Sequence, residues 1–244
     1  MEKYTKVPLS ELNCQEGAML LVDKPLKWTS FNVVNKVKWL SKSKTGHAGT
    51  LDPLATGLLL LCTGKFTKQL MGYTKLDKEY TGTFVLGATT PTFDLESDPE
   101  NFKSIAGITE AQLQEALLPF TGAIQQVPPA HSAIKKDGKP MYLLARKGVD
   151  VKMEPRNVTI YEFELTAIRL PEVDFRVKVS SGTYIRSLAN DYGAALGCGG
   201  YLKALRRTEI GEYRVEDAYT MEELIAHFKP EQLQEFRDKQ ASNA

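Results

Sequence analysis

Segments with the patterns of strands and helices alternate along this chain of 244 residues, but without a regular strand–helix–strand repeat. Short apolar runs such as residues 19–22 are typical of buried strands, and the alternation over residues 173–179 is typical of a strand with one wet face. This irregular order predicts an α+β fold around one extended sheet. The expected strands are residues 19–22, 57–62, 80–86, 158–167 and 173–179, and the expected helices are residues 30–40, 64–73, 109–118 and 183–196.

Local signals predict where several of these elements begin. A helix capped by Thr29 or Ser30 is expected to bury apolar residues near helical spacing, namely Phe31, Val34, Val37 and Leu40. Two further helices are expected to start at capping boxes, formed by Thr109 with Gln112 and by Thr220 with Glu223. A phase slip at Tyr161 predicts a β-bulge in the strand over residues 158–167.

Composition and missing motifs exclude several classes of protein. With 42% apolar and 25% charged residues, the chain is not disordered or collagen-like. The longest apolar run, residues 58–62, is far shorter than the ~20 residues of a membrane span, and no signal-peptide core is present. The three cysteines form no CxxC pair, so we expect no disulfide and no metal site. A reduced, cytoplasmic protein is therefore expected.

Sequence motifs for common cofactors are also missing. The chain has no P-loop, no dinucleotide-binding glycine pattern, no H-E-x-x-H pair and no Gly-x-Ser-x-Gly elbow. An enzyme with this sequence is expected to work without a cofactor or a catalytic metal.

The most unusual local sequence is residues 46–57, Gly-His-Ala-Gly-Thr-Leu-Asp-Pro-Leu-Ala-Thr-Gly, a polar loop that runs into an apolar strand. An Asp-Pro pair alone is most often a turn, because Asp favours turn initiation and Pro fixes φ. Here the pair is flanked by glycines, which allow close approach of a ligand. The segment is therefore a candidate site around His47 and Asp52.

This segment resembles the signature of the TruB family of pseudouridine synthases, Gly-His-x-Gly-x-Leu-Asp-Pro-x-Ala-x-Gly, at every fixed position. Further matches follow in the family's order over roughly residues 20–224. They are Asp23-Lys24-Pro25, Lys78-Glu79-Tyr80, Ser181-Gly182-Thr183-Tyr184-Ile185-Arg186, and Gly197-Cys198-Gly199 followed by Leu205-Arg206-Arg207.

The resemblance implies a mixed, largely antiparallel sheet with an RNA-binding insertion, and an isomerase that acts on tRNA. Its substrate would be the uridine of the T-loop at conventional position 55. The uracil would leave ribose C1′, rotate and rejoin through its C5 atom, with no cofactor. The implied partner is the T-arm of tRNA, with no membrane and no protein partner, and we expect a monomer.

The resemblance also assigns roles to individual residues. Asp52 matches the invariant catalytic aspartate, and Arg186 the arginine that would keep this carboxylate ionised against the cost of desolvation. A surface arginine at a helix start is the plainer interpretation, but its charge would oppose the helix dipole there. Tyr80 matches the tyrosine that stacks on the target base, a contact worth about 1–3 kcal/mol.

The remaining matched residues are predicted to bind substrate. His47 matches a histidine that contacts RNA near the flipped base, and Asp94 an acidic residue that pairs with the active-site arginine. The segment around Asp94 departs from the family pattern by carrying Pro91. The other predicted binding residues are Lys24, Tyr184 and Leu205; core packing is the plainer interpretation of Leu205.

Predicted domain limits follow from the same comparison. We expect an N-terminal extension over residues 1–18, one catalytic domain over residues 19–228 with an insertion near residues 125–155, and a C-terminal tail over residues 229–244. About 25 residues follow Tyr219, too few for the additional PUA domain that many bacterial members carry.

Three alternatives remain open at this point. The chain could be a module that binds structured RNA without modifying it, although the matched Asp52 and Arg186 argue against this. It could be a synthase of the same fold that acts on ribosomal or another RNA, or one that a separate RNA guides. A hydrolase that uses Asp52 and His47 lacks a supporting nucleophile motif.

The formal net charge of +1 would disfavour a nucleic acid if charge were spread evenly, but it is distributed in blocks. Residues 24–44 hold six lysines and no acid, and residues 135–156 hold seven basic residues against three acidic ones. Residues 94–115 and 209–244 are acidic in balance. Because screening limits phosphate attraction to about 8–10 Å, the local blocks matter more than the sum.

Overall fold

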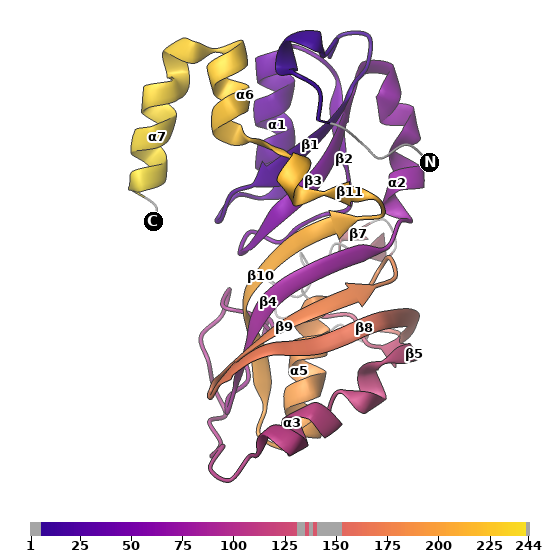
Figure 1. Ribbon diagram of the computed structural model, residues 1–244, viewed down its shortest axis with the longest axis vertical. Coiled ribbons are helices and arrows are strands. Elements are labelled where there is room, and N and C mark those ends of the chain that lie inside the picture. The colour runs from indigo at the N-terminus through magenta and orange to yellow at the C-terminus, as the bar shows by residue number, and fades with distance from the viewer. Residues whose placement is uncertain (1–5, 131–134, 137–138, 141–152, 243–244) are drawn as a thin grey trace. The chain divides into compact units, whose positions relative to one another are not determined.

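The computed structural model describes residues 6–130, 135–136, 139–140 and 153–242, which divide into two compact units (Figure 1). Unit 1 comprises Met1–Lys78 and Arg206–Ala244, and unit 2 comprises Glu79–Leu205. The chain passes from one unit to the other within two strands, β4 (Lys78–Leu86) and β10 (Gly200–Ile210).

The sheet of unit 1 is built on β1 (Met19–Lys24) and β3 (Ala55–Thr63), which pair antiparallel. The strand order is β12-β1-β3-β10, with β2 also paired to β3 and β11 to β10. The β1–β12 pair is parallel. The short strands are β2 (Thr45–Ala48), β11 (Tyr213–Arg214) and β12 (Tyr219–Thr220).

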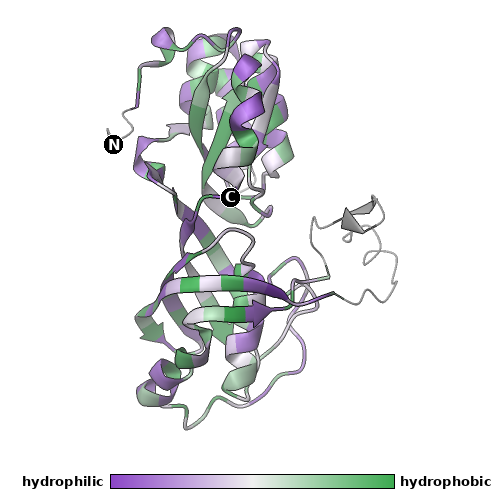
Figure 2. Cartoon of the chain, turned by 90° about the vertical axis from the view of Figure 1, so that its right-hand side faces the viewer, coloured by the Kyte–Doolittle hydropathy of each residue, from purple (hydrophilic) through white to green (hydrophobic). Residues whose placement is uncertain are grey.

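Both faces of β3 are buried, as the apolar run predicts. Leu59 and Leu61 belong to one core cluster, and Leu58 and Leu60 to another. In Figure 2 the strands of this unit are largely green, whereas the helices beside them carry polar residues. A strand covered on both faces reads as a continuous apolar run rather than as an alternating one.

Helices α1 (Ser30–Ser41) and α6 (Met221–Phe228) pack against the first of these clusters and against each other (Figure 1). Helix α7 (Leu233–Ala241) follows α6, and its Phe236 meets Trp28 edge to face at 6.0 Å. The other helical segments of unit 1 are η1 (Leu9–Glu11), η2 (Gly64–Gln69), α2 (Leu70–Thr74), η4 (Val215–Asp217) and η5 (Pro230–Gln232).

The predicted apolar stripe of α1 is confirmed except at Phe31. Val34, Val37 and Leu40 are buried together with Val33, but Phe31 is 67% exposed. At 100° per residue Phe31 lies about 120° from Val37, which is outside the buried arc. The cap is Thr29, whose side chain accepts the N–H of Asn32.

The sheet of unit 2 has the order β10-β4-β9-β8-β5. Its further strands are β5 (Gly122–Gln126), β8 (Arg156–Arg169) and β9 (Glu172–Val179), and β8 pairs antiparallel with both of its neighbours. A register shift between Ile160 and Glu162 confirms the predicted bulge at Tyr161. The α+β class with a largely antiparallel sheet is therefore confirmed.

Helix α5 (Ile185–Ala195) is joined to this sheet by aromatic side chains. Tyr192 lies 5.8 Å from Phe84 and 6.2 Å from Phe163, and Phe84 stacks on Phe175 at 4.0 Å between ring centroids. Unit 2 also contains α3 (Glu110–Glu115) and η3 (Leu118–Phe120). The capping boxes at Thr109 and Thr220 are both present.

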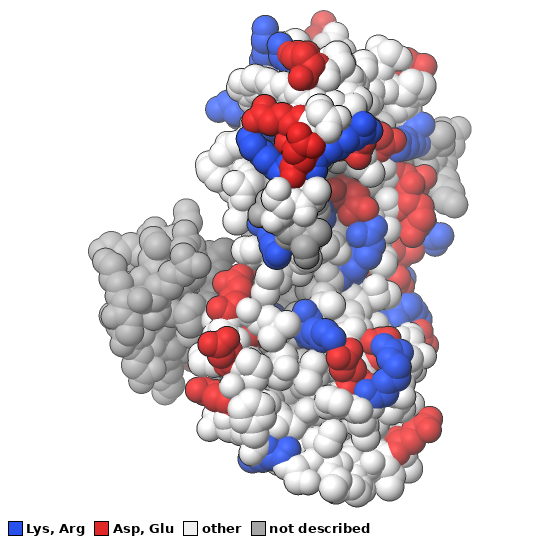
Figure 3. Space-filling view, turned by 90° about the vertical axis from the view of Figure 1, so that its left-hand side faces the viewer, with Lys and Arg blue, Asp and Glu red and all other residues white. Residues whose placement is uncertain are grey.

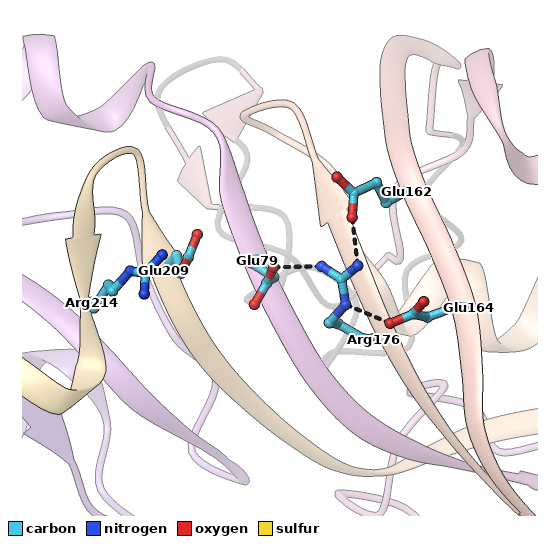
Figure 4. A network of polar contacts seen from close by, with 6 residues as sticks. All are labelled: Glu79, Glu162, Glu164, Arg176, Glu209 and Arg214. Atoms are coloured by element: carbon cyan, nitrogen blue, oxygen red, sulfur yellow. Dashed lines mark hydrogen bonds and ion pairs between the residues drawn. The ribbon is translucent and has the colours of Figure 1, made fainter.

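A charged network covers part of the sheet of unit 2 (Figure 4). Arg176 on β9 bonds Glu79 at 2.7 Å, Glu162 at 2.5 Å and Glu164 at 2.6 Å, from β4 and β8. The three carboxylates raise the pKa of Arg176. Through these ion pairs, one cation connects β9 to β4 and β8. On the face drawn in Figure 3, basic side chains mostly lie beside acidic ones, so that face is not uniformly basic.

Most of the predicted insertion lies outside the described residues, and so does most of the basic block at 135–156. Within it, β6 (Lys135–Lys136) and β7 (Lys139–Pro140) form a separate antiparallel pair. In the described part of the chain, no helix is long and apolar enough to cross a membrane. Likewise, the described residues contain no cluster of three His, Cys, Asp or Glu side chains suited to a metal.

Candidate active site

The loop that carries Asp52 connects β2 to β3 and is fixed by hydrogen bonds on both sides of the aspartate. The Ser30 hydroxyl donates to the carbonyl of Leu51 at 3.0 Å and accepts from the N–H of Leu51 at 2.8 Å. After Asp52, the carbonyl of Pro53 accepts from the N–H of Lys27 at 2.9 Å. The backbone of Asp52 is thus held between two anchored neighbours.

Lys24 lies beneath this loop with no exposed surface. Its ammonium donates to the carbonyls of Pro25 at 3.0 Å, Trp28, and Pro53 at 3.4 Å. Burial lowers the pKa of Lys24 to about 8, and the negative charge of Asp52 opposes that shift. The sequence predicts a substrate contact here, but an ammonium enclosed by backbone carbonyls has no surface to offer an RNA.

Arg207 contacts two of the glycines in the matched segment and explains one of them, Gly57. This arginine is 1% exposed, and its guanidinium donates to the carbonyls of Leu58 at 2.8 Å and Gly49 at 3.1 Å. At Gly57 (φ +100°) a Cβ atom would lie 2.3 Å from the carbonyl oxygen of Arg207. The backbone of β10 therefore approaches β3 where only glycine fits.

Arg206 joins two matched segments that are distant in sequence. Its guanidinium binds both carboxylate oxygens of Asp23, at 3.0 and 2.7 Å. Such a bidentate pair is strongly oriented. The Asp-Lys-Pro segment of β1 is thereby attached to the Leu-Arg-Arg segment of β10.

His47 on β2 lies opposite Leu61 of β3. Its Nδ1 atom is buried and, within the described structure, has no hydrogen-bond partner. Burial lowers the pKa of His47, a backbone hydrogen bond with Gly49 opposes this, and the Arg207 charge adds to it. The ring is therefore neutral at pH 7, with a buried nitrogen that is not satisfied.

In unit 2, the structure brings Asp94 and Arg186 together. Arg186, in the first turn of α5, is 5% exposed, and its Nε atom lies 3.5 Å from Oδ2 of Asp94. Its Nη1 also donates to the carbonyl of Thr92 at 3.1 Å. Asp94 itself accepts the N–H of Glu96 at 3.0 Å. The segment with Pro91 thus still presents its carboxylate to the arginine.

The remaining predicted residues of unit 2 occupy β4, β10 and the start of α5. Tyr80 on β4 is 8% exposed, and Leu205 on β10 is partly buried. Tyr184 precedes α5, and its backbone is held by Gln126, which accepts its N–H at 2.8 Å and donates to its carbonyl at 3.0 Å. Gln126 therefore fixes the backbone that carries the Tyr184 ring.

Sequence reasoning did not assign roles to Ser30, Gln126 or Arg207. Ser30 was visible only as a possible helix cap, and Arg207 as part of a matched motif. Their partners lie 21, 58 and 149 residues away, so no local pattern reveals them.

Two family models match this chain and together cover most of its length. Residues 37–185 match the family model described as TruB family pseudouridylate synthase (N terminal domain). The chain belongs to the TruB family of pseudouridylate synthases. Residues 186–238 match the tRNA pseudouridylate synthase B C-terminal domain. The predicted family is confirmed, and so is the prediction of an enzyme of this class.

Curated relatives of this TruB-family enzyme cover nearly its whole length. It is 54% identical over 211 residues to tRNA pseudouridine synthase B of Flavobacterium johnsoniae. This alignment covers 83% of this chain and 92% of the relative. It is 47% identical over 231 residues to the protein of that name from Phocaeicola vulgatus, covering 92% and 98%.

Solved structures show the same fold in larger chains. A chain in the crystal structure of a Cbf5-Nop10-Gar1 complex is 30% identical, with a TM-score of 0.67 over 88% of this chain. A chain in an H/ACA RNP bound to a substrate RNA is 28% identical, with a TM-score of 0.64. The TruB-family chain spans only 55% and 54% of these two proteins.

Proposed function

We propose that this enzyme converts the uridine at position 55 in the T-loop of tRNA to pseudouridine, and that Asp52 is its catalytic carboxylate. The names of the relatives at 54% and 47% identity support the tRNA substrate. The observation that carries the catalytic assignment is the fixation of the Asp52 loop by Ser30 and Lys27. Catalytic groups need such support, because small displacements are costly in rate.

The proposed reaction breaks the bond between ribose C1′ and uracil N1 and forms a bond between C1′ and C5. N1 keeps the electron pair of the broken bond and gains a proton, and C5 loses its proton to solvent. Asp52 acts on the sugar or base as an anion. The positive charge of Lys24 interacts with Asp52 and offsets part of the desolvation that would neutralise it.

The other site residues enter the proposal through the matched motifs. Tyr80 stacks on the target base, Arg186 supplies a cation for the reacting carboxylate, and Tyr184 and Leu205 line the base pocket. His47 contacts RNA near the flipped nucleotide, and the partly exposed side chain leaves surface for that contact. Asp94 holds Arg186.

The central test replaces Asp52 by asparagine. Release of tritium from tRNA transcribed with 5-tritiated uridine is expected to fall to background in Asp52→Asn, while the Kd for tRNA stays within about twofold. Asp98→Asn, an exposed aspartate of unit 2, makes the same change and is expected to turn over normally. Normal turnover by Asp52→Asn would reject the catalytic assignment.

The substrate is tested with a transcript that carries cytidine at position 55. The wild-type enzyme is expected to release no tritium above background from it. Unchanged release would assign another uridine. Binding of tRNA by the wild-type enzyme with no release from any transcript would favour a binding module.

A second proposal concerns assembly and location. We propose that the chain acts alone, as a monomer in the cytoplasm, whereas the solved relatives are in complexes named with Nop10 and Gar1. Light scattering on the purified, active protein tests this. A mass near 27.2 kDa together with full turnover is expected, and activity confined to a larger assembly would contradict it.

A further inference from the structure

A basic cavity lies at the C-terminal end of α1, in unit 1. Its volume is about 570 Å³, and its walls come from the last turn of α1 and the residues that lead into β2. Three lysines and an indole dominate the lining: Lys38, Lys42, Lys44 and Trp39. Asn35 and Thr45 add polar groups. None of these residues belongs to the matched motifs.

Trp39 is unusually exposed for an indole. It keeps 49% of its surface open to solvent, although α1 buries four other apolar side chains. Lys36 and Lys229 place their ammonium groups 4.9 and 5.8 Å from its ring centroid. Two ammonium groups therefore lie near the indole, which itself lines the basic cavity.

Among the described residues, Lys38, Lys42 and Lys44 form no ion pair, and residues 24–44 contain no acidic residue at all. Lys239, another exposed lysine of unit 1, is by contrast paired with Glu235 at 2.5 Å. Three lysines that form no ion pair among the described residues thus share the lining of one cavity.

Stabilisation of α1 does not account for this concentration. A helix C-terminus carries the equivalent of about half a negative charge, which one or two cations offset. Lys38 in the last turn and Lys42 at the C-cap already supply two. Lys44 lies beyond the helix and adds a third positive charge to the lining. The excess suits a polyanion.

We propose that this cavity binds a phosphodiester segment of the RNA substrate outside the reacting loop. Lys38, Lys42 and Lys44 contact its phosphates, and the open surface of Trp39 packs against a ribose or base. Cations interleaved with an aromatic side chain are the usual means of holding an RNA strand without reading its sequence. The inference rests on the proposed function only in taking RNA as the substrate.

Fluorescence gives a direct test, because the chain has only two tryptophans. Trp28→Phe leaves Trp39 as the single indole, and Trp28 is packed against Phe236 away from the cavity lining. Titration of this variant with transcribed tRNA is expected to quench and saturate Trp39 emission at the Kd measured by filter binding. Absence of any change in Trp39 emission at saturation would overturn the proposal.

Removal of charge tests the lysines. Lys38→Gln/Lys42→Gln is expected to raise the Kd for tRNA, and the KM, about tenfold, and to lower the slope of log K against log salt by about 2. The matched control is Lys65→Gln/Lys68→Gln, which removes the same charge from exposed sites of unit 1 outside the cavity. Equal effects of the two pairs would show a general charge effect and reject the cavity.

A competing polyanion and the tritium assay distinguish an RNA site from an acidic-protein site and from a failure of the proposed function. If polyglutamate of matched charge saturates Trp39 emission as tightly as tRNA, the surface recognises an acidic protein instead and the proposal fails. If wild type releases no tritium but the lysine pair still weakens tRNA binding specifically, the proposed function fails and the binding surface stands.

Discussion

The side chain of Ser30 forms hydrogen bonds with both backbone polar groups of Leu51, the carbonyl and the N–H. One hydroxyl donates to the Leu51 carbonyl at 3.0 Å and accepts from the Leu51 N–H at 2.8 Å. Ser30 is 2% exposed and begins α1, and Leu51 immediately precedes Asp52. The position of the proposed catalytic carboxylate is therefore set by the end of a helix packed in the core.

Ser30→Ala tests this relationship. Both hydrogen bonds are lost, so we expect a loss of about 1–3 kcal/mol in the free energy of unfolding. We also expect kcat to fall by roughly 10- to 100-fold, because a displaced Asp52 meets the substrate less often in reacting geometry. Single-turnover tritium release measures the rate, filter binding the Kd for tRNA, and urea unfolding the stability. The Kd is expected to be unchanged.

Ser41→Ala is the matched control. Ser41 is a buried serine at the other end of the same helix, and its hydroxyl donates to the carbonyl of Val37 at 2.8 Å. Its removal is expected to cost a similar amount of stability with no change in kcat. An equal fall of kcat in both variants would show that Ser30 contributes stability alone.

Features whose partners lie within one turn or one strand could be predicted from the sequence. The capping boxes at Thr109 and Thr220 and the β-bulge at Tyr161 are examples, because the residues that cause them are neighbours in the sequence. The hydrogen bonds that hold the candidate site in place could not be predicted from the sequence, because their partners are far apart in the chain. Arg207, for example, donates to the carbonyl of Leu58, which is 149 residues away. Lys24 is a similar case. Its place in a matched motif indicates a functional residue, but the motif does not show that its side chain is buried.

Gly57→Ala tests why the matched segment ends in glycine. A Cβ atom there would lie 2.3 Å from a backbone oxygen of Arg207, at a φ of +100°. Overpacking and left-handed strain each cost about 1–3 kcal/mol, so we expect a loss of about 3 kcal/mol or more. Urea unfolding monitored by circular dichroism measures it.

The control for this change is Gly72→Ala in α2. A Cβ atom at Gly72 meets nothing within 4 Å, and the backbone there is helical. Alanine is expected to stabilise the protein by about 0.5–1 kcal/mol. Similar stability of the two variants would contradict the close approach of β10 to β3.

Asp94→Ala tests the buried pair with Arg186. Both residues are at most 5% exposed, and removal of the carboxylate takes a negative charge away from beside a buried guanidinium. Breaking such a pair typically costs about 3–5 kcal/mol. Glu172→Ala breaks an exposed pair with Lys203 in the same unit and is expected to cost less than about 1 kcal/mol. Equal losses of unfolding free energy would show that Asp94 does not neutralise Arg186.

His47→Gln tests the neutral state of the buried imidazole through the pH dependence of stability. Burial lowers the pKa of His47 in the folded protein below its ordinary value of 6.5. As the pH falls below 6.5, the unfolded chain binds a proton at this position before the folded protein does. Wild type should therefore lose stability relative to His47→Gln between pH 7 and pH 5.5, by at most about 1.4 kcal/mol per pH unit. Urea unfolding at four pH values measures the difference, and a relative gain by wild type on acidification would mean that the Gly49 hydrogen bond outweighs burial and that the ring is charged.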